Sequence, residues 1–192
     1  YSGVIISRIA KKKGEDTCET FACRGGHAID FISGALGTKE AEKIVPAVIQ
    51  RIREFPGDVV YTRDTHGTDY LSTQEGKHLP VVHCISGTAG WEIHPDVLQA
   101  GYGKTVQIID KPTFGSQALC RFAETENYDA IELIGLCTDI CVISNALCLK
   151  AALWETPIGV RPSCCAGVTP ESHNNALSAL QMCQIDLLGD EK

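Results

Sequence analysis

The chain has 192 residues, of which 44% are hydrophobic, with a net charge of −7 and a pI near 5.3. These values favour one globular domain with a sizeable core. They argue against nucleic acid or an anionic membrane as a partner, because both attract basic surfaces. The sequence shows neither a secretory leader nor an apolar run that could cross a bilayer, so we expect a cytoplasmic protein.

From residue 38 onward, helical and strand patterns alternate along the chain. This alternation is typical of an α/β domain with a three-layer α/β/α, doubly wound (Rossmann-like) and mainly parallel six-stranded sheet, and we expect residues 1–192 to form that single domain. The predicted elements are a helix over 38–54, strands over 58–63 and 104–110, a helix over 116–125, a strand over 129–136, a helix over 139–154, a strand over 157–161, a helix from 169 to about 183 and a strand over 185–188.

Ten cysteines are many for this length, but their spacing favours neither a disulfide framework nor a zinc module. The chain has no Cys-x-x-Cys pair, and the adjacent Cys164 and Cys165 are poorly placed to bridge. Most of the other cysteines lie in apolar segments, as reduced core cysteines do. We therefore expect a reducing compartment.

Cys141 comes five residues after the end of the predicted buried strand 129–136 and lies in the first turn of the helix predicted over 139–154. At that position the unpaired backbone N–H groups and the helix dipole favour a thiolate, which lowers the pKa of a cysteine. Cys141 is therefore a candidate nucleophile. The alternative is a small buried side chain without chemistry, the usual role of a free cysteine.

Asp64 and His66 follow the strand over 58–63, and His83 comes after the next polar loop. One carboxylate and two imidazoles could hold a divalent cation such as Zn²⁺, Fe²⁺ or Mn²⁺ with positions left open, as in catalytic sites. The alternative is a turn cap and loop hydrogen bonds. Lys111 ends the strand over 104–110, so the sheet would bring it to the same edge.

Three motifs recur in this order in one family. They are His83-Cys-Ile-Ser-Gly-Thr-Ala-Gly-Trp-Glu-Ile-His-Pro, Lys111-Pro-Thr-Phe-Gly-Ser and Gly135-Leu-Cys-Thr-Asp-Ile-Cys-Val. On these motifs the chain resembles the isochorismatase-like cysteine hydrolases, and among them the nicotinamidase-like branch. The resemblance runs from about Asp30 to Leu188.

The resemblance implies a cysteine amidohydrolase that cleaves a small amide such as nicotinamide to the acid and ammonia through a thioester. Cys141 would be the nucleophile and Lys111 the triad lysine. The oxyanion hole would comprise the backbone N–H groups of Cys137 and Cys141, with a cis peptide bond between Leu136 and Cys137.

The resemblance also implies a metal site, a substrate pocket and a homo-oligomer. Tyr70 stands where some members carry a further histidine, which favours a site with three protein ligands. Phe31 and Trp91 match residues that line the pocket. The implied metal ligands are Asp64, His66 and His83.

The resemblance breaks before Asp30, so residues 1–29 are atypical of the family. Gly26 occupies the position of the triad aspartate in the family motif Asp-x-Gln-x-Asp-Phe, which ends here at Asp30-Phe31. Either these residues are not the native N-terminus, or the chain has diverged into a catalytically impaired small-molecule-binding protein. A different small amide or ureido substrate stays open, as does a redox protein in which Cys137 and Cys141 cycle as a disulfide.

Overall fold

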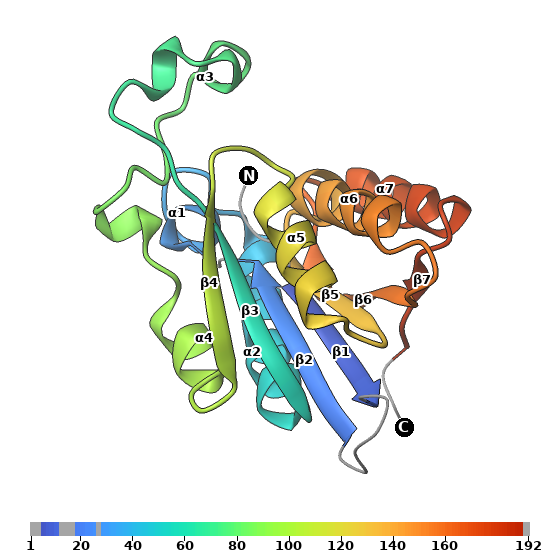
Figure 1. Cartoon of the computed structure of the whole chain (residues 1–192). Coiled ribbons are helices and arrows are strands. Elements are labelled where there is room, and N and C mark those ends of the chain that lie inside the picture. Colours follow the sequence, from blue (N-terminus) through green and yellow to red (C-terminus); the bar gives the residue numbers. More distant parts are fainter. Residues whose placement is uncertain (1–4, 12–17, 26–27, 190–192) are drawn as a thin grey trace.

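A seven-stranded sheet lies between two layers of helices in the computed structural model, which describes residues 5–11, 18–25 and 28–189 (Figure 1). The strand order is β4-β3-β1-β2-β5-β6-β7. The strands are β1 (Ile5–Lys11), β2 (Cys18–Gly25), β3 (Gly57–Asp64), β4 (Thr105–Lys111), β5 (Ile131–Leu136), β6 (Ile158–Ala166) and β7 (Asp186–Leu187).

The predicted class is confirmed, but the predicted count of six strands is wrong for the described residues. β2 pairs in parallel with both β3 and β5, and the pairs β3–β4, β5–β6 and β6–β7 are parallel as well. Six strands therefore form the parallel set. The seventh strand, β1, runs antiparallel to β2, β3 and β5. The strands placed from the sequence all lie after residue 38, so neither β1 nor β2, which precede that residue, was placed.

Helices α2 and α4 cover one face of the sheet, while α5, α6 and α7 cover the other (Figure 1). Thr38 and Thr169 cap α2 and α7 with their side chains, and Pro170 stands at the first position of α7, as expected for helix starts. The helices are α1 (Ile29–Ile32), α2 (Lys39–Glu54), α3 (Gln74–His78), α4 (Pro95–Ala100), α5 (Gln117–Glu126), α6 (Ile143–Ala152) and α7 (Pro170–Met182).

Three parallel strands end at the same edge of the sheet and position the chemistry. β3 ends at Asp64 and β4 ends at Lys111, and these two residues are partners in the β3–β4 register. Every residue of β5 is buried, which suits a central strand covered on both faces. Beyond this edge, the arm formed by residues 65–84 projects from the body and carries α3 (Figure 1).

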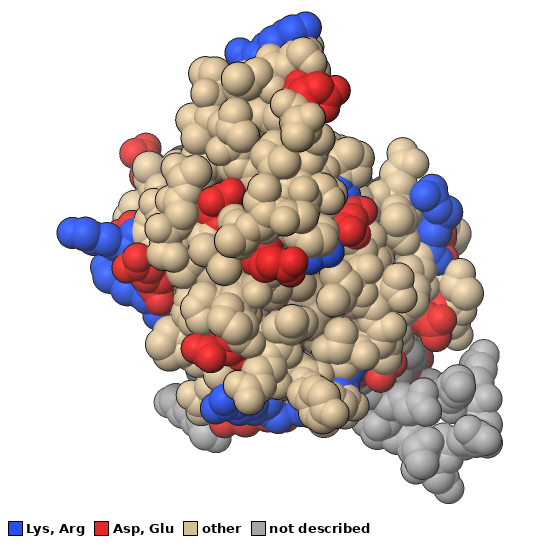
Figure 2. All heavy atoms as spheres, turned by 90° about the vertical axis from the view of Figure 1, so that its left-hand side faces the viewer, with Lys and Arg blue, Asp and Glu red and all other residues tan. Residues whose placement is uncertain are grey.

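Acidic and basic side chains both occur on the face of the molecule drawn in Figure 2. On the face shown in Figure 2, Lys and Arg lie mostly toward the margins, and acidic side chains lie between them. No helix among the described residues is long and apolar enough to span a membrane.

Candidate functional site

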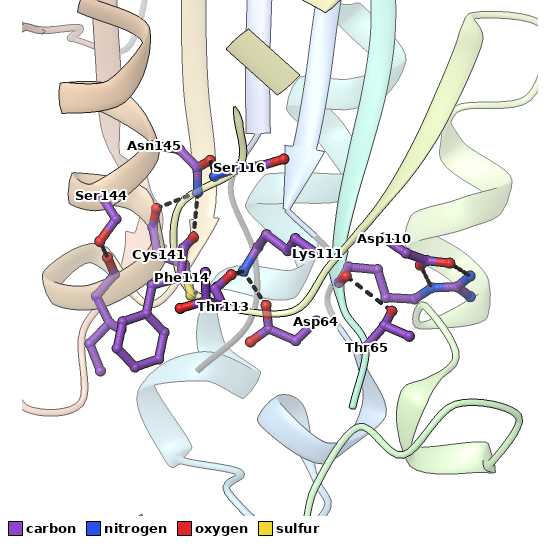
Figure 3. A network of polar contacts seen from close by, with 12 residues as sticks. Asp64, Thr65, Asp110, Lys111, Thr113, Phe114, Ser116, Cys141, Ser144 and Asn145 are labelled. Atoms are coloured by element: carbon purple, nitrogen blue, oxygen red, sulfur yellow. Dashed lines mark hydrogen bonds and ion pairs between the residues drawn. The ribbon is translucent and has the colours of Figure 1, made fainter. Parts of the chain in front are cut away.

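Lys111 is a buried cation at the centre of the site, and its side chain is 1% exposed. Its Nζ pairs with Asp64 Oδ1, donates to the carbonyl oxygen of Thr113 at 3.0 Å and lies 3.6 Å from Cys141 Sγ (Figure 3). Burial disfavours the ammonium form, but the charges and hydrogen bonds of Asp64 and Cys141 outweigh it and raise the pKa of Lys111. The side chain is thus held as an ammonium beside a thiol.

Cys141 is fully buried and lies in a π-helical turn, Thr138–Val142, that precedes α6. As predicted, it lies in the first turn of the helical segment after β5, but this turn is π-helical rather than α-helical. The N–H of Val142 reaches back to the carbonyl oxygen of Cys137 at 3.0 Å, a spacing of five residues that widens the turn. The Leu136–Cys137 peptide bond is cis, as the resemblance implied.

Asp64, His66 and His83 are brought together as predicted. All three are buried, and one ligand atom from each lies within 4.8 Å of the others. The Nε2 atoms of His66 and His83 are buried and form no hydrogen bond with any described residue. Buried polar atoms of this kind indicate a ligand, and the donor set suits a divalent cation.

Glu75 lies beside this group, and no pattern in the sequence pointed to it. Its Oε1 lies 3.5 Å from His66 Nε2 and 3.7 Å from His83 Nε2. Burial, with help from the charge of Asp64, raises its pKa. The side chain stands in the first turn of α3 after the N-cap Thr73, where an acid is ordinary in any helix. Only the folding of the arm turns it toward the histidines.

The imidazole rings of His66 and His83 are neutral at neutral pH. Burial is the main cause that lowers the pKa of His83 to about 4, and it lowers the pKa of His66 as well. At neutral pH both rings therefore offer a lone pair rather than a charge. Tyr70 packs its ring 4.7 Å from His66 and 4.9 Å from His83, and its hydroxyl donates to Leu79. Its role in the described structure is packing.

The two predicted pocket residues have different surroundings. Phe31 is buried with its ring edge-on to His83 at 5.3 Å, so it borders the candidate ligand group, which consists of Asp64, His66 and His83. Trp91 donates from Nε1 to Thr65 Oγ1 at 2.9 Å and lies under the Arg63 guanidinium. A cavity of about 580 Å³, lined in part by Glu75, Phe114 and Ile140, adjoins the site.

Gly26, at the position that the resemblance assigns to the triad aspartate, lies outside the described residues. Asp30, four positions further on, accepts from the backbone N–H of Cys84 at 2.8 Å. Its carboxylate also lies so close to Gly90 that a Cβ there would be 2.3 Å away. Asp30 thus holds a loop, and the carboxylate recorded on Lys111 is that of Asp64.

The fold and the site define an α/β protein with a buried cysteine, lysine and carboxylate cluster at the carboxyl ends of parallel strands. The isochorismatase domain model matches residues 27–189. The chain therefore belongs to the isochorismatase family of hydrolases. A search of curated proteins gives no match.

Solved structures with the same fold include three amide hydrolases. A pyrazinamidase/nicotinamidase from Streptococcus mutans is 24% identical, with a TM-score of 0.73 over 85% of this chain and 96% of that one. A Pyrococcus horikoshii pyrazinamidase in complex with zinc is 23% identical, with a TM-score of 0.68 over 84% and 93%. N-carbamoylsarcosine amidase from Thermoplasma acidophilum is 24% identical, with a TM-score of 0.67 over 87% and 94%. At these identities the likeness concerns the fold.

Proposed function

We propose that this protein is a cysteine amidohydrolase that converts a small amide, with nicotinamide as the first candidate, to the acid and ammonia. The observation that carries the proposal is the 3.6 Å approach of Lys111 Nζ to Cys141 Sγ beside the buried ligand group. A thiol next to a fixed ammonium is stabilised as the thiolate, which is the nucleophilic form.

In the proposed reaction, the Cys141 thiolate attacks the amide carbon, and the carbonyl π electrons move onto oxygen. The backbone N–H groups of Cys137 and Cys141 stabilise that oxyanion. The intermediate collapses, the C–N bond breaks, and Lys111 gives a proton to the departing nitrogen, which leaves as ammonia. Water then attacks the thioester, its proton returns to Lys111, and the C–S bond breaks to release the acid and the thiolate.

Asp64, His66 and His83, with the Glu75 carboxylate as a fourth ligand, would hold a divalent cation. When bound, such an ion supplies a Lewis acid that can anchor a nitrogen or oxygen of the substrate. Zinc is the first candidate, because the structural neighbour from Pyrococcus horikoshii is in complex with zinc; Fe²⁺ and Mn²⁺ suit the same donors. Phe31 and Trp91 would border the substrate.

A catalytically impaired binding protein is the second candidate. It is favoured by Gly26 at the family position of the triad aspartate and by the engagement of Asp64 with Lys111. Removal of a general base costs on the order of 10²- to 10⁴-fold in rate. A ureido substrate is also a candidate, because one structural neighbour is a carbamoylsarcosine amidase.

Ammonia release from a panel of nicotinamide, pyrazinamide, N-carbamoylsarcosine and simple aliphatic amides tests the proposal, with zinc added and with zinc removed. Turnover of a panel amide that is lost in Cys141→Ala supports the cysteine mechanism. Saturable binding of a panel amide without ammonia release supports the binding protein, and ammonia release that survives Cys141→Ala contradicts the mechanism. The resemblance also implies a homo-oligomer, and light scattering, which measures the mass of the protein in solution, tests this prediction.

A further inference from the structure

Asn145 links the segment that follows Lys111 to the turn that carries Cys141. It lies on α6, four residues after Cys141, and is fully buried. Its Nδ2 donates to the carbonyl oxygens of Phe114 at 2.7 Å and Cys141 at 2.8 Å, and its Oδ1 accepts from the N–H of Ser116 at 2.9 Å (Figure 3). One planar amide therefore binds both the loop that follows Lys111 and the turn that carries the sulfur.

The loop over 112–116 is held near its start by Lys111 and at its end by Asn145. The carbonyl oxygen of Thr113 accepts from Lys111 Nζ at 3.0 Å, so the position of the loop also determines where the ammonium lies. Gly115 lets the loop approach α6 closely, because a Cβ there would lie 3.3 Å from Cys148 Sγ. A shift of this loop would move Lys111 relative to Cys141.

No acidic or purely apolar side chain of similar size reproduces these bonds. The site offers two carbonyl oxygens and one N–H group, and an amide supplies two donors and an acceptor in fixed geometry. An aspartate carboxylate has no donor for the carbonyl oxygens, and leucine has no polar group. The amide of Asn145 therefore matches the hydrogen-bonding groups around it in the number of donors and acceptors.

We propose that Asn145 is a positioning residue, which holds the Lys111 loop against the Cys141 turn and so keeps the ammonium within contact of the nucleophilic sulfur. This inference rests on the proposed function for its kinetic consequence, but its geometric part concerns only Cys141 and Lys111. Small misplacements of reacting groups cost on the order of 10²-fold in rate, so a loosened clamp reduces turnover while the substrate pocket stays intact.

The test compares Asn145→Asp, Asn145→Leu and Asn145→Ser with the control Asn175→Asp, which makes the same isosteric change at an exposed position of α7. Each variant is assayed for kcat and KM and for alkylation by iodoacetamide, resolved cysteine by cysteine with mass spectrometry. We expect kcat to fall about 10- to 100-fold with a much smaller change in KM. We also expect slower alkylation of Cys141, while the buried Cys120, Cys164 and Cys165 react as in the wild type.

Two results would overturn the inference. One is an unchanged kcat and an unchanged Cys141 alkylation rate in folded Asn145 variants. The other is a uniform acceleration at all buried cysteines, which shows a loss of stability rather than of positioning. If the wild-type protein releases no ammonia from any amide, the proposed function fails by itself, and the alkylation rates alone then decide the role of Asn145. Asn145→Ser serves where the other two variants do not fold.

Discussion

Lys111 Nζ lies 3.6 Å from Cys141 Sγ, although the two residues are 30 positions apart and belong to different elements. Lys111 ends β4, and Cys141 lies in the turn after β5, with β3, β1 and β2 between these two strands in the sheet order. The same ammonium pairs with Asp64, which also belongs to the ligand group. The pair of Lys111 and Asp64 therefore connects the proposed nucleophile to the proposed cation site. A substitution of Lys111 or of Asp64 should affect both.

Cys141→Ala should abolish amide hydrolysis, because no other described side chain pairs with Lys111 as a nucleophile. We expect a loss on the order of 10⁴- to 10⁶-fold in kcat, the scale seen when a covalent nucleophile is removed. The measurement is ammonia release under saturating substrate. Cys183→Ala, at an exposed cysteine, is the control and should leave the rate unchanged; a matching loss there would point to a general effect of cysteine removal.

Lys111→Met should destabilise the metal-free protein by about 3–5 kcal/mol, because it leaves the buried Asp64 carboxylate without its counter-charge. The adjacent register pair provides the control. Arg63 and Asp110 form an ion pair at 2.8 Å, but Asp110 is 47% exposed. Asp110→Asn should therefore cost only about 0–1 kcal/mol. Urea unfolding in the presence of EDTA measures both, and equal losses would contradict the difference in burial.

Glu75→Gln should weaken zinc binding about 10- to 100-fold, the range found when a group that supports a metal site is changed. The carboxylate faces both histidines, and the amide keeps the shape but loses the charge. Titration calorimetry with Zn²⁺ measures the affinity directly and does not depend on activity. The matched control is Glu171→Gln, which changes an acid in the first turn of α7. An unaltered zinc affinity in Glu75→Gln would show that Glu75 does not contribute to the site.

His173 should make the protein less stable as the pH falls below about 6.5. Burial lowers its pKa, although the charge of Asp139 acts in the opposite direction. Its Nδ1 contacts Thr138 Oγ1 at 2.7 Å, and Glu40 and Lys43 of α2 line the same small cavity.

Because the folded pKa is lowered, the unfolded chain takes up the proton first, so this stabilisation is full above the unfolded pKa and is lost as pH falls. Urea unfolding between pH 5 and pH 7 should give a flatter pH profile for His173→Gln than for the wild type. Parallel profiles would show that His173 does not contribute. The histidines of the ligand group titrate in both proteins, so the difference isolates His173.

Gly26→Asp should raise kcat by about 10²- to 10⁴-fold if the family's triad base is missing at this position, since that is the usual contribution of general acid and base groups. The prediction rests on the sequence alone, because residue 26 is not among those the structure describes. Comparison with Gly25→Asp tests whether any added carboxylate has this effect. A rate no higher than that of the wild type would show that the base is not restored at this position.

The sequence by itself determined the class of fold and most of the site. The regular alternation after residue 38 predicted the parallel strands β3 to β7, because strand and helix periodicities differ and can be read without knowledge of contacts. The positions of Asp64, His66, Lys111 and Cys141 after predicted strands indicated that they lie together, since parallel strands bring their carboxyl ends to one edge. His83 was predicted from the segment after the polar loop.

Only the tertiary structure decided the relationships between groups that no local pattern encodes. Glu75 looks like any acid at a helix start until the arm folds and turns it toward His66 and His83. Asn145 occurs in an apolar helix without a signal in its neighbours, and its partners come from a loop 29 to 31 positions away. Contacts between distant segments depend on packing and burial, and this is why Asp64 was predicted as a metal ligand but not as the partner of Lys111.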